Sequence, residues 1–127
     1  ESFCGAVSEE AADAAAGSTI PVTQLEHMLK EREEGSRDFV LVDVREPHEP
    51  GIADLPQHGQ VLIPTGEFMD RISELEPESE IVLYCRSGAR SEWAAKLLLQ
   101  AGFSSVLNLR GGVLAWRAEV DPTMQAY

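Results

Sequence analysis

Cysteine, basic residues and long apolar runs are all scarce in this sequence. Only two of the 127 residues are cysteines, Cys4 and Cys85, which argues against a disulfide framework and favours a reducing, cytoplasmic compartment. Ten Lys and Arg against 22 Asp and Glu give a net charge of -12, so neither nucleic acid nor an anionic membrane is expected as a partner. No run is long and apolar enough to span a membrane, and the N-terminus lacks a signal-peptide pattern.

Metal-binding patterns are missing too. There is no C-x-x-C motif, and His27, His48 and His58 are scattered along the chain, so no metal site is expected. Hydrophobic residues, by contrast, make up 43% of the sequence, although aromatic residues make up only 6%. This composition and length fit one globular domain built on aliphatic packing.

The first 18 residues differ in composition from the rest. They are rich in Ala and Glu and offer few side chains for a core, so we interpret residues 1–18 as a linker or tail and residues 19–127 as the folded domain. Cys4 falls in this linker outside any motif, and we interpret it as incidental rather than as a second, resolving thiol. Because the sequence does not begin with Met, we expect it to be a fragment of a longer protein.

Apolar strands alternate with amphipathic helices through the predicted domain. The continuous apolar run at residues 39–44 is typical of a strand that is covered on both faces, as in parallel sheets. The alternation predicts an α/β fold with a central, mostly parallel sheet flanked by helices on both faces. The strands are expected at residues 19–20, 39–44, 61–63, 81–84 and 105–109, and the helices at residues 23–34, 67–75, 91–100 and 113–120.

Local signals mark some of the ends and connections of these elements. Thr23 and Glu26 have the spacing of a capping box, with Val22 placed as the hydrophobic staple, which predicts that Thr23 caps the first helix. Gly102 follows the third helix and is well placed for a C-cap. Residues 47–59 are rich in Pro, Gly and His and predict an irregular connection.

The chemically informative stretch is the loop at residues 85–90, between a strand and the third expected helix. Cys85 opens this loop, and the small residues Gly88 and Ala89 let its backbone curl tightly. The backbone N–H groups of such a loop can converge on one point, where the helix dipole also favours negative charge. An environment of this kind lowers the pKa of a cysteine from about 8.5 to roughly 3.5–7.5 and makes it a nucleophilic thiolate.

Arg86 and Arg90 add positive charge to this loop in an otherwise acidic protein, which suits an anion attacked by, or carried on, the sulfur of Cys85. Cysteine phosphatases use a similar loop with the spacing C-x5-R, but position 91 is Ser91 and Arg90 gives C-x4-R. The loop is therefore one residue short for phosphate and fits the outer sulfur of a persulfide better. The structural alternative is a buried cysteine at a strand end, with both arginines in surface ion pairs.

Asp43 interrupts the apolar run at residues 39–44 near its carboxyl end, and a buried aspartate is costly unless it is paired or hydrogen-bonded. One interpretation is that Asp43 tethers a neighbouring loop. The other is that it lies beside the reactive site, because the ligands of parallel sheets gather beyond the carboxyl ends of the strands. The sequence leaves both interpretations open, and both can hold.

Several segments together resemble the rhodanese (sulfurtransferase) family. The loop CRSGARS is similar to the family's active-site loop, FVLVDVREPHE to its strand with a D-x-R-E segment, and VLIP and LRGGVLAW to its central strand end and its last turn and helix. The resemblance runs from about Thr19 to Tyr127 and points to the C-terminal domain of adenylyltransferase–sulfurtransferases of the MoeZ type, which serve molybdopterin and thiamine biosynthesis. The leader and the ending DPTMQAY are similar to theirs as well.

This resemblance implies a rhodanese-like fold and a thiosulfate sulfurtransferase activity. Cys85 would be the nucleophile that becomes a persulfide, and Asp43 and Arg45 would support the loop rather than react. The loop residues that would bind the anionic donor are Arg86, Ser87, Gly88, Ala89 and Arg90.

The resemblance also implies partners. Sulfur would pass from thiosulfate or another persulfide donor to the adenylated C-terminus of a ubiquitin-like sulfur carrier protein, next to an upstream adenylating domain, without a metal or organic cofactor. One rival hypothesis is a phosphatase or arsenate reductase of the same fold. The other is a non-catalytic binding module, and the presence of Cys85 speaks against it.

Overall fold

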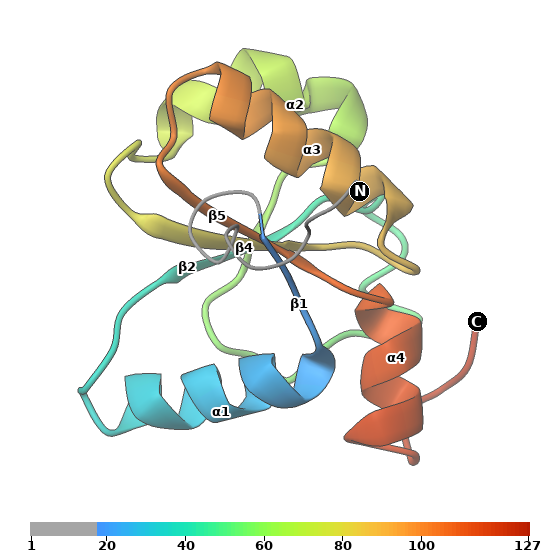
Figure 1. Cartoon of the computed structure of the whole chain (residues 1–127). Helices are drawn as coiled ribbons and strands as arrows, with labels where there is room; N and C mark the ends of the chain where they lie inside the picture. Colours follow the sequence, from blue (N-terminus) through green and yellow to red (C-terminus); the bar gives the residue numbers. More distant parts are fainter. Residues whose placement is uncertain (1–17) are drawn as a thin grey trace, which may run out of the picture.

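The computed structural model describes residues 18–127 and contains a five-stranded sheet in the order β1-β5-β4-β2-β3, in which all neighbouring strands are parallel (Figure 1). This confirms the predicted α/β architecture. The strands are β1 (Ser18–Ile20), β2 (Val40–Asp43), β3 (Val61–Leu62), β4 (Glu80–Tyr84) and β5 (Ser105–Leu109). The helices are α1 (Val22–Glu33), α2 (Thr65–Arg71), the 3-10 helix η3 (Ile72–Glu74), α3 (Ala89–Gln100) and α4 (Gly112–Glu119).

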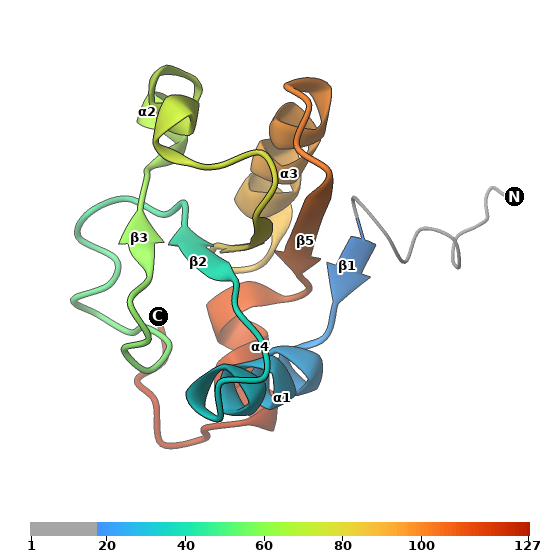
Figure 2. The same ribbon diagram turned by 90° about the vertical axis from the view of Figure 1, so that its left-hand side faces the viewer.

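The helices form one layer on each face of the sheet. Figure 1 shows α1 and α4 on one side of the strands and α2 and α3 on the other, and Figure 2 shows the same layers from the side. Successive side chains of a strand point to opposite faces, so β4 serves both layers. Val82 and Tyr84 pack with α1 and α4, whereas Ile81 and Leu83 pack with α2 and α3. Residues 81–84 of β4 are therefore apolar on both faces.

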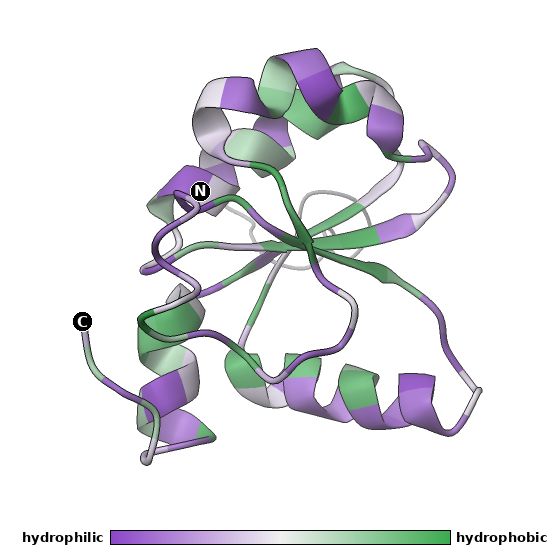
Figure 3. Cartoon of the chain, turned by 180° about the vertical axis from the view of Figure 1, so that it is seen from behind, coloured by the Kyte–Doolittle hydropathy of each residue, from purple (hydrophilic) through white to green (hydrophobic). Residues whose placement is uncertain are grey.

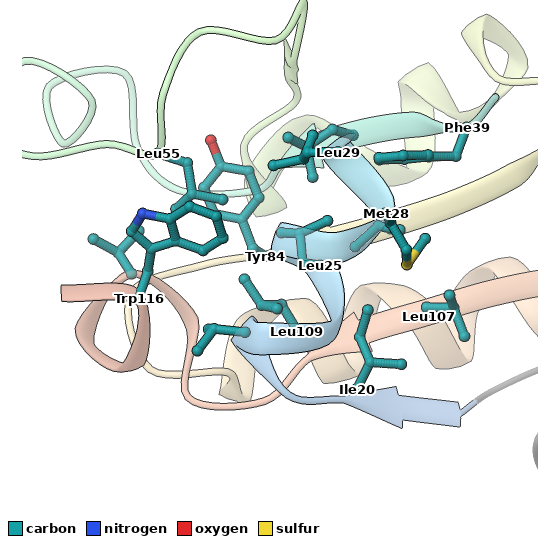
Figure 4. Packing of buried hydrophobic residues seen from close by; sticks show 14 of the residues in the cluster. Ile20, Leu25, Met28, Leu29, Phe39, Leu55, Tyr84, Leu107, Leu109 and Trp116 are labelled. Carbon is teal, nitrogen blue, oxygen red and sulfur yellow. The ribbon is translucent and has the colours of Figure 1, made fainter. Parts of the chain in front are cut away.

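Large apolar side chains fill the layer between the sheet and the helices α1 and α4 (Figure 4). Leu25 and Met28 project from α1, Leu109 from β5 and Trp116 from α4, and none of them is more than 3% exposed. Leu55, from the irregular connection after β2, joins the same cluster. Burying each such side chain contributes about 1.5–3 kcal/mol, so this layer is a main source of stability.

The hydropathy pattern explains how the sequence produces these layers (Figure 3). The buried residues of α1 are Val22, Leu25, Met28 and Leu29, which recur three and four positions apart and so lie on one face of a helix. Figure 3 shows α1 hydrophobic toward the sheet and hydrophilic away from it. One apolar face is what a helix needs to pack on a sheet.

The beginning of α1 differs from the prediction. The helix begins at Val22, its N-cap position is Pro21, and no side chain caps it, so the predicted capping box of Thr23 and Glu26 is wrong. Pro21 has an extended backbone, with φ -77° and ψ 162°. Its ring fixes this φ and its missing N–H costs nothing there, so the chain can turn from β1 into the helix earlier than a Thr23 cap would allow.

The stretch predicted as one helix at residues 67–75 is split into two elements. Helix α2 ends at Arg71, and the tighter 3-10 turn η3 follows it. Leu75 then takes an extended conformation and is 6% exposed. Because the helical segment ends at Glu74, the extended Leu75 can place its side chain in the core.

The start of the folded domain and the end of α3 lie close to their predicted positions. Ser18 belongs to β1, one residue before the predicted start of the domain, and Gly102 follows α3 with φ +99°, as a C-terminal cap requires. The predicted linker up to residue 17, including Cys4, lies outside the described residues. Within residues 18–127, no helix has both the length and the apolar character to cross a membrane.

Candidate active site

Residues 85–90, which we name the Cys85 loop, lie at the edge of the sheet where the parallel strands end. Cys85 is the first residue beyond β4, and α3 begins within the loop. The start of α4 holds the loop through backbone hydrogen bonds. The Val113 N–H donates to the Cys85 carbonyl and the Leu114 N–H to the Arg86 carbonyl, both at 3.0 Å. A segment distant in sequence therefore fixes the shape of the loop.

Two glycines show why small residues are required here. Gly88 is the N-cap residue of α3 and has φ 111°, in a region that residues with a Cβ rarely adopt. A Cβ at Gly112 would lie 2.2 Å from the carbonyl oxygen of Cys85 and 2.7 Å from that of Arg86. Because no Cβ can approach a backbone oxygen so closely, only glycine at this position lets α4 hold the loop.

The sulfur of Cys85 lies inside the curl of the loop, and the residue is 1% exposed. Its Sγ accepts a hydrogen bond from the Gly88 N–H at 3.0 Å and lies 3.5 Å from the hydroxyl oxygen of Ser91. Burial alone would raise the pKa of this thiol. Hydrogen bonds from the Ser91 hydroxyl and from the N–H groups of Ser91, Gly88 and Ser87 outweigh it, so the pKa lies below its usual value. The loop therefore stabilises a thiolate.

Arg90, in the first turn of α3, is held by a carboxylate that the sequence did not single out. Its guanidinium donates two hydrogen bonds to Glu49, at 2.7 and 2.9 Å. Glu49 is 6% exposed, and its pairing with Arg90 lowers the pKa of its carboxyl to about 2. The same pair, with a smaller contribution from the charge on Cys85, raises the pKa of Arg90. Glu49 is thus the direct partner of Arg90, and Cys85 acts on it only as a nearby charge.

Arg86 contacts the C-terminal segment instead. Its guanidinium donates from Nε to the main-chain oxygen of Tyr127 at 2.9 Å, and its Nη2 donates to the same oxygen. The guanidinium carbon also lies 5.1 Å from the centre of the Tyr127 ring, within the range of a cation–π contact. Both arginines predicted to bind a donor anion therefore have partners within the protein.

Asp43 and Arg45 form a buried ion pair at the same edge of the sheet. The Arg45 guanidinium is fully buried and donates to both carboxylate oxygens of Asp43, at 2.9 and 2.8 Å. It also donates to the Ala53 carbonyl at 2.8 Å, to the Asp54 carboxylate at 2.8 Å and to the Tyr127 hydroxyl at 2.7 Å. Through Arg45, Asp43 thus tethers the connection after β2, as one of the two interpretations of the sequence expected.

The link from this pair to the Cys85 loop is indirect. The hydroxyl of Tyr127 accepts the hydrogen bond from Arg45 and donates one to Glu49 at 3.1 Å, and Glu49 binds Arg90. Among the described residues, Asp43 and Arg45 make no side-chain hydrogen bond to the loop itself. Their geometry fits the supporting role that the resemblance implied for them.

Asp54 and Tyr84 complete the arrangement around Arg45. The Tyr84 hydroxyl donates to Asp54 at 2.6 Å, and burial raises the pKa of both groups. We name Asp43, Arg45, Asp54, Tyr84 and Tyr127 the carboxylate–arginine network. Its side chains come from four separate parts of the chain, yet they satisfy one buried guanidinium.

Two cavities flank the Cys85 loop. One of about 480 Å³ is lined by Thr65, Gly66, Ala89, Arg90 and Trp93, between the first turns of α2 and α3. The other, of about 300 Å³, lies on the side of the loop near Asn108 and Arg110. In the part of the chain that the structure describes, no three His, Cys, Asp or Glu side chains are grouped so that they could hold a metal ion.

Sequence reasoning thus found the loop but missed four side chains around it. Glu49 and Tyr127 lie in irregular segments without periodicity, so no local pattern marks them. In the sequence, Ser91 is distinguished only as the position where a phosphatase loop has arginine, and Asn108 only as part of an apolar strand. A polar residue in an otherwise apolar strand beside a cysteine loop was the one available signal, and it points to Asn108.

A model of the rhodanese-like domain family matches residues 22–119 of this chain. The chain is 37% identical over 129 residues to the probable adenylyltransferase/sulfurtransferase MoeZ of Mycobacterium tuberculosis; the match covers all of this chain and 31% of MoeZ. It is 44% identical over 94 residues to a sulfurtransferase of Allochromatium vinosum, covering 69% of this chain and 80% of that protein.

A solved structure shows the same fold. The rhodanese-like domain protein from Staphylococcus aureus matches with a TM-score of 0.70 at 24% identity, covering 87% of this chain and 98% of that one. The chain spans about a third of the length of MoeZ. By contrast, its fold matches nearly the whole of the Staphylococcus aureus protein.

Proposed function

Because this chain belongs to the rhodanese-like domain family and is related to its sulfurtransferases, we propose that it transfers sulfane sulfur by carrying it as a persulfide on Cys85. The family resemblance and the rhodanese-like fold expected from the sequence are confirmed by the same comparisons. The observation that carries the proposal is the position of Cys85 Sγ inside a loop whose Gly88 N–H donates to it at 3.0 Å. Converging N–H groups stabilise negative charge on sulfur.

In the loading step, the Cys85 thiolate attacks the outer sulfur of thiosulfate. A bond forms between Cys85 Sγ and that sulfur, the S–S bond of thiosulfate breaks, and sulfite leaves with the electron pair. The negative charge of the thiolate then resides on the outer sulfur of the persulfide, so the step needs no proton and no external oxidant.

We assign donor binding to the side chains of Arg86 and Arg90 and to the backbone N–H groups of Ser87, Gly88 and Ala89. Arg86 is exposed and bound to a main-chain oxygen of Tyr127, so a donor oxygen can replace that partner. Arg90 is fixed by Glu49 and contributes a stationary positive charge.

In the unloading step, the persulfide gives its outer sulfur to an acceptor. Cyanide takes it directly, forming thiocyanate and regenerating the thiolate. For the adenylated C-terminus of a ubiquitin-like sulfur carrier protein, the outer sulfur attacks the acyl carbon and displaces AMP. Two equivalents of a thiol then reduce the resulting acyl disulfide, releasing the carrier thiocarboxylate and free Cys85.

The partner part of the proposal is supported by the relatives. MoeZ is a probable adenylyltransferase/sulfurtransferase, so we propose that this domain works beside an adenylating domain, joined to it through residues 1–18. A free nucleophilic thiol also suits a reducing, cytoplasmic setting. No metal or organic cofactor is needed for either step.

The direct test is thiosulfate:cyanide sulfurtransfer by the wild type and by Cys85→Ala, with thiocyanate as the readout. We expect activity in the wild type and none in the variant, whose fold is checked by circular dichroism. Equal thiocyanate production by both proteins contradicts the proposal. Mass spectrometry after thiosulfate treatment should show one added sulfur on the Cys85 peptide, which a non-catalytic binding module would not acquire.

The phosphatase alternative makes a separate prediction. Arg90 closes the loop after four intervening residues, and the next position is Ser91, whose hydroxyl faces the Cys85 sulfur. We therefore expect no turnover of p-nitrophenyl phosphate. Turnover that disappears in Cys85→Ala would favour the phosphatase over the sulfurtransferase.

A further inference from the structure

Ser91 is a fully buried residue whose hydroxyl has more acceptors than it has protons. Its Oγ lies 2.5 Å from Asn108 Oδ1, 3.2 Å from the Gly88 carbonyl oxygen and 3.5 Å from Cys85 Sγ. A serine hydroxyl can donate only one hydrogen bond at a time. These three acceptors therefore compete for the same proton. The Asn108 oxygen is the nearest of them, and Cys85 Sγ is the one whose charge changes during the proposed reaction.

Asn108 is placed to be the resting partner in this competition. It lies in β5, which pairs with β4, the strand just before Cys85, and only 7% of it is exposed. Its carboxamide oxygen is neutral, whereas a thiolate is charged. Hydrogen bonds to charged acceptors are stronger than those to neutral ones. The Ser91 hydroxyl should therefore donate to Asn108 when Cys85 Sγ carries no charge, and to Cys85 Sγ when the thiolate forms.

We propose that Ser91 is a positioning residue whose hydroxyl follows the charge on Cys85, donating to Sγ in the thiolate and to Asn108 in the persulfide. The inference rests on the proposed function, because the persulfide carries its charge on the outer sulfur and leaves the inner Sγ neutral. Ser91 would then stabilise the form of the enzyme that attacks the donor. Asn108 Oδ1, the acceptor nearest to the hydroxyl at 2.5 Å, would receive its hydrogen bond after loading.

The charged groups around the sulfur stay in place in this scheme. Arg86 and Arg90 belong to the Cys85 loop, and Glu49 and Tyr127 from other segments are bound to them. Arg110, just beyond β5, shares a cavity with Gly88 and Asn108. None of these groups is altered by removing the Ser91 hydroxyl or the Asn108 carboxamide, so the two substitutions isolate the proposed switch.

The two substitutions should affect the ionisation of Cys85 differently. Ser91→Ala removes a donor to the thiolate, so the thiol should ionise at higher pH. Asn108→Ala removes the competing acceptor while leaving the hydroxyl free to face the sulfur, so the thiol should ionise at the same or a lower pH. A role limited to packing would not produce this difference, because both residues are buried and their truncation would loosen the loop alike.

The experiment measures the rate of Cys85 alkylation by iodoacetamide between pH 4 and 10 in the full chain, by quantifying the modified peptide. The Cys4 peptide reports on the reagent in the same sample. We expect Ser91→Ala to raise the midpoint by about one pH unit, which slows alkylation roughly tenfold below it. Asn108→Ala should not raise the midpoint, and Asn108→Ala combined with Ser91→Ala should match Ser91→Ala alone. Ser36→Ala, which removes an exposed hydroxyl on the Glu31 carbonyl, is the matched control.

Two results would overturn the proposal: an unchanged midpoint in Ser91→Ala, or a midpoint raised in Asn108→Ala as much as in Ser91→Ala. Asn108→Ala keeps the inference testable even where Ser91→Ala lowers the folded fraction. Alkylation does not require sulfur transfer. If Ser91→Ala raises the midpoint as expected but the wild type forms no thiocyanate, the proposed function alone is contradicted. If the wild type forms thiocyanate but Ser91→Ala leaves the midpoint unchanged, this inference alone is contradicted.

Discussion

The Cys85 loop and the carboxylate–arginine network lie at the same edge of the sheet but are built in different ways. The loop uses consecutive residues and mostly backbone N–H groups, with Gly88 N–H at 3.0 Å from the sulfur. The network uses side-chain charges from residues as far apart as Asp43 and Tyr127. The loop stabilises negative charge on one sulfur through backbone N–H groups, as the proposed exchange of an anion requires, whereas the network satisfies charges that are permanently buried.

This difference separates reactivity from support. Backbone N–H groups stabilise a thiolate without adding a charge that must itself be neutralised, so the loop can hold a sulfur in several states. The buried guanidinium of Arg45 needs all its partners at once, because an unpaired buried charge is very costly. We therefore expect substitutions in the network to reduce stability first, and substitutions that touch the loop to alter the chemistry of Cys85.

The largest expected effect comes from Arg45→Met. This substitution leaves the carboxylates of Asp43 and Asp54 buried without their cation, and breaking a buried pair in this way costs about 3–5 kcal/mol. Urea denaturation should show this loss in the free energy of unfolding. The alkylation midpoint of Cys85 in the remaining folded protein should stay near that of the wild type.

The matched control is Arg71→Met in α2. Arg71 also contacts two carboxylates, Glu67 and Glu74, but both pairs are exposed to solvent, where ion pairs contribute little. Equal destabilisation by the two substitutions would contradict the assignment of the network as support. A shifted Cys85 midpoint in Arg45→Met would show that the network tunes the loop directly.

Gly112→Ala tests how far the loop depends on a distant segment. Its Cβ would meet the Cys85 and Arg86 carbonyls, and its φ of +55° adds strain. Steric overlap and left-handed strain together should cost about 3 kcal/mol and reduce sulfurtransfer strongly. Gly102→Ala is the matched control, because its φ is +99° but nothing lies within 4 Å of the added Cβ. Equal effects would mean that backbone strain, not the contact of α4 with the loop, explains the loss.

The same contrast explains what the sequence predicts and what it does not. Most of the elements follow from apolar runs and helical spacing, but the single helix expected at residues 67–75 is split into α2 and η3. The Cys85 loop follows from adjacent residues whose backbone N–H groups surround the sulfur. Thr23 was misassigned because Pro21 starts the helix earlier. The sequence does not predict Glu49 because its contact with Arg90 depends on how the irregular connection after β2 folds, which no local pattern encodes.

Glu49→Gln gives a smaller effect with a defined pH dependence. The carboxyl has a pKa of about 2, below the usual 4.5. A lowered folded-state pKa contributes stability above pH 4.5 that is lost as the pH falls toward 2. The variant should be less stable by about 1–2 kcal/mol at pH 7, since Arg90 is partly exposed and screened. Urea denaturation at pH 7, 4 and 2.5 should also show that the free energy of unfolding of the variant falls less with acid than that of the wild type.

Glu67→Gln provides the comparison for that titration, since its carboxylate pairs with Arg71 at an exposed position. Its stability should follow the wild type at every pH. A Glu49→Gln variant with an undiminished acid response would mean that the carboxylates of the network, rather than the pair that holds Arg90, dominate acid unfolding.

The smallest expected effect tests the one hydroxyl that joins the two regions. The Tyr127 hydroxyl accepts from Arg45 and donates to Glu49, so Tyr127→Phe removes the bridge and keeps the ring beside Arg86. At this half-buried position we expect a loss of about 1 kcal/mol. A double-mutant cycle with Glu49→Gln, measured by urea denaturation, should give a coupling energy clearly above zero. Strict additivity would mean that the network and the Arg90 pair are energetically separate, and that Tyr127 supports the loop only through its contact with Arg86.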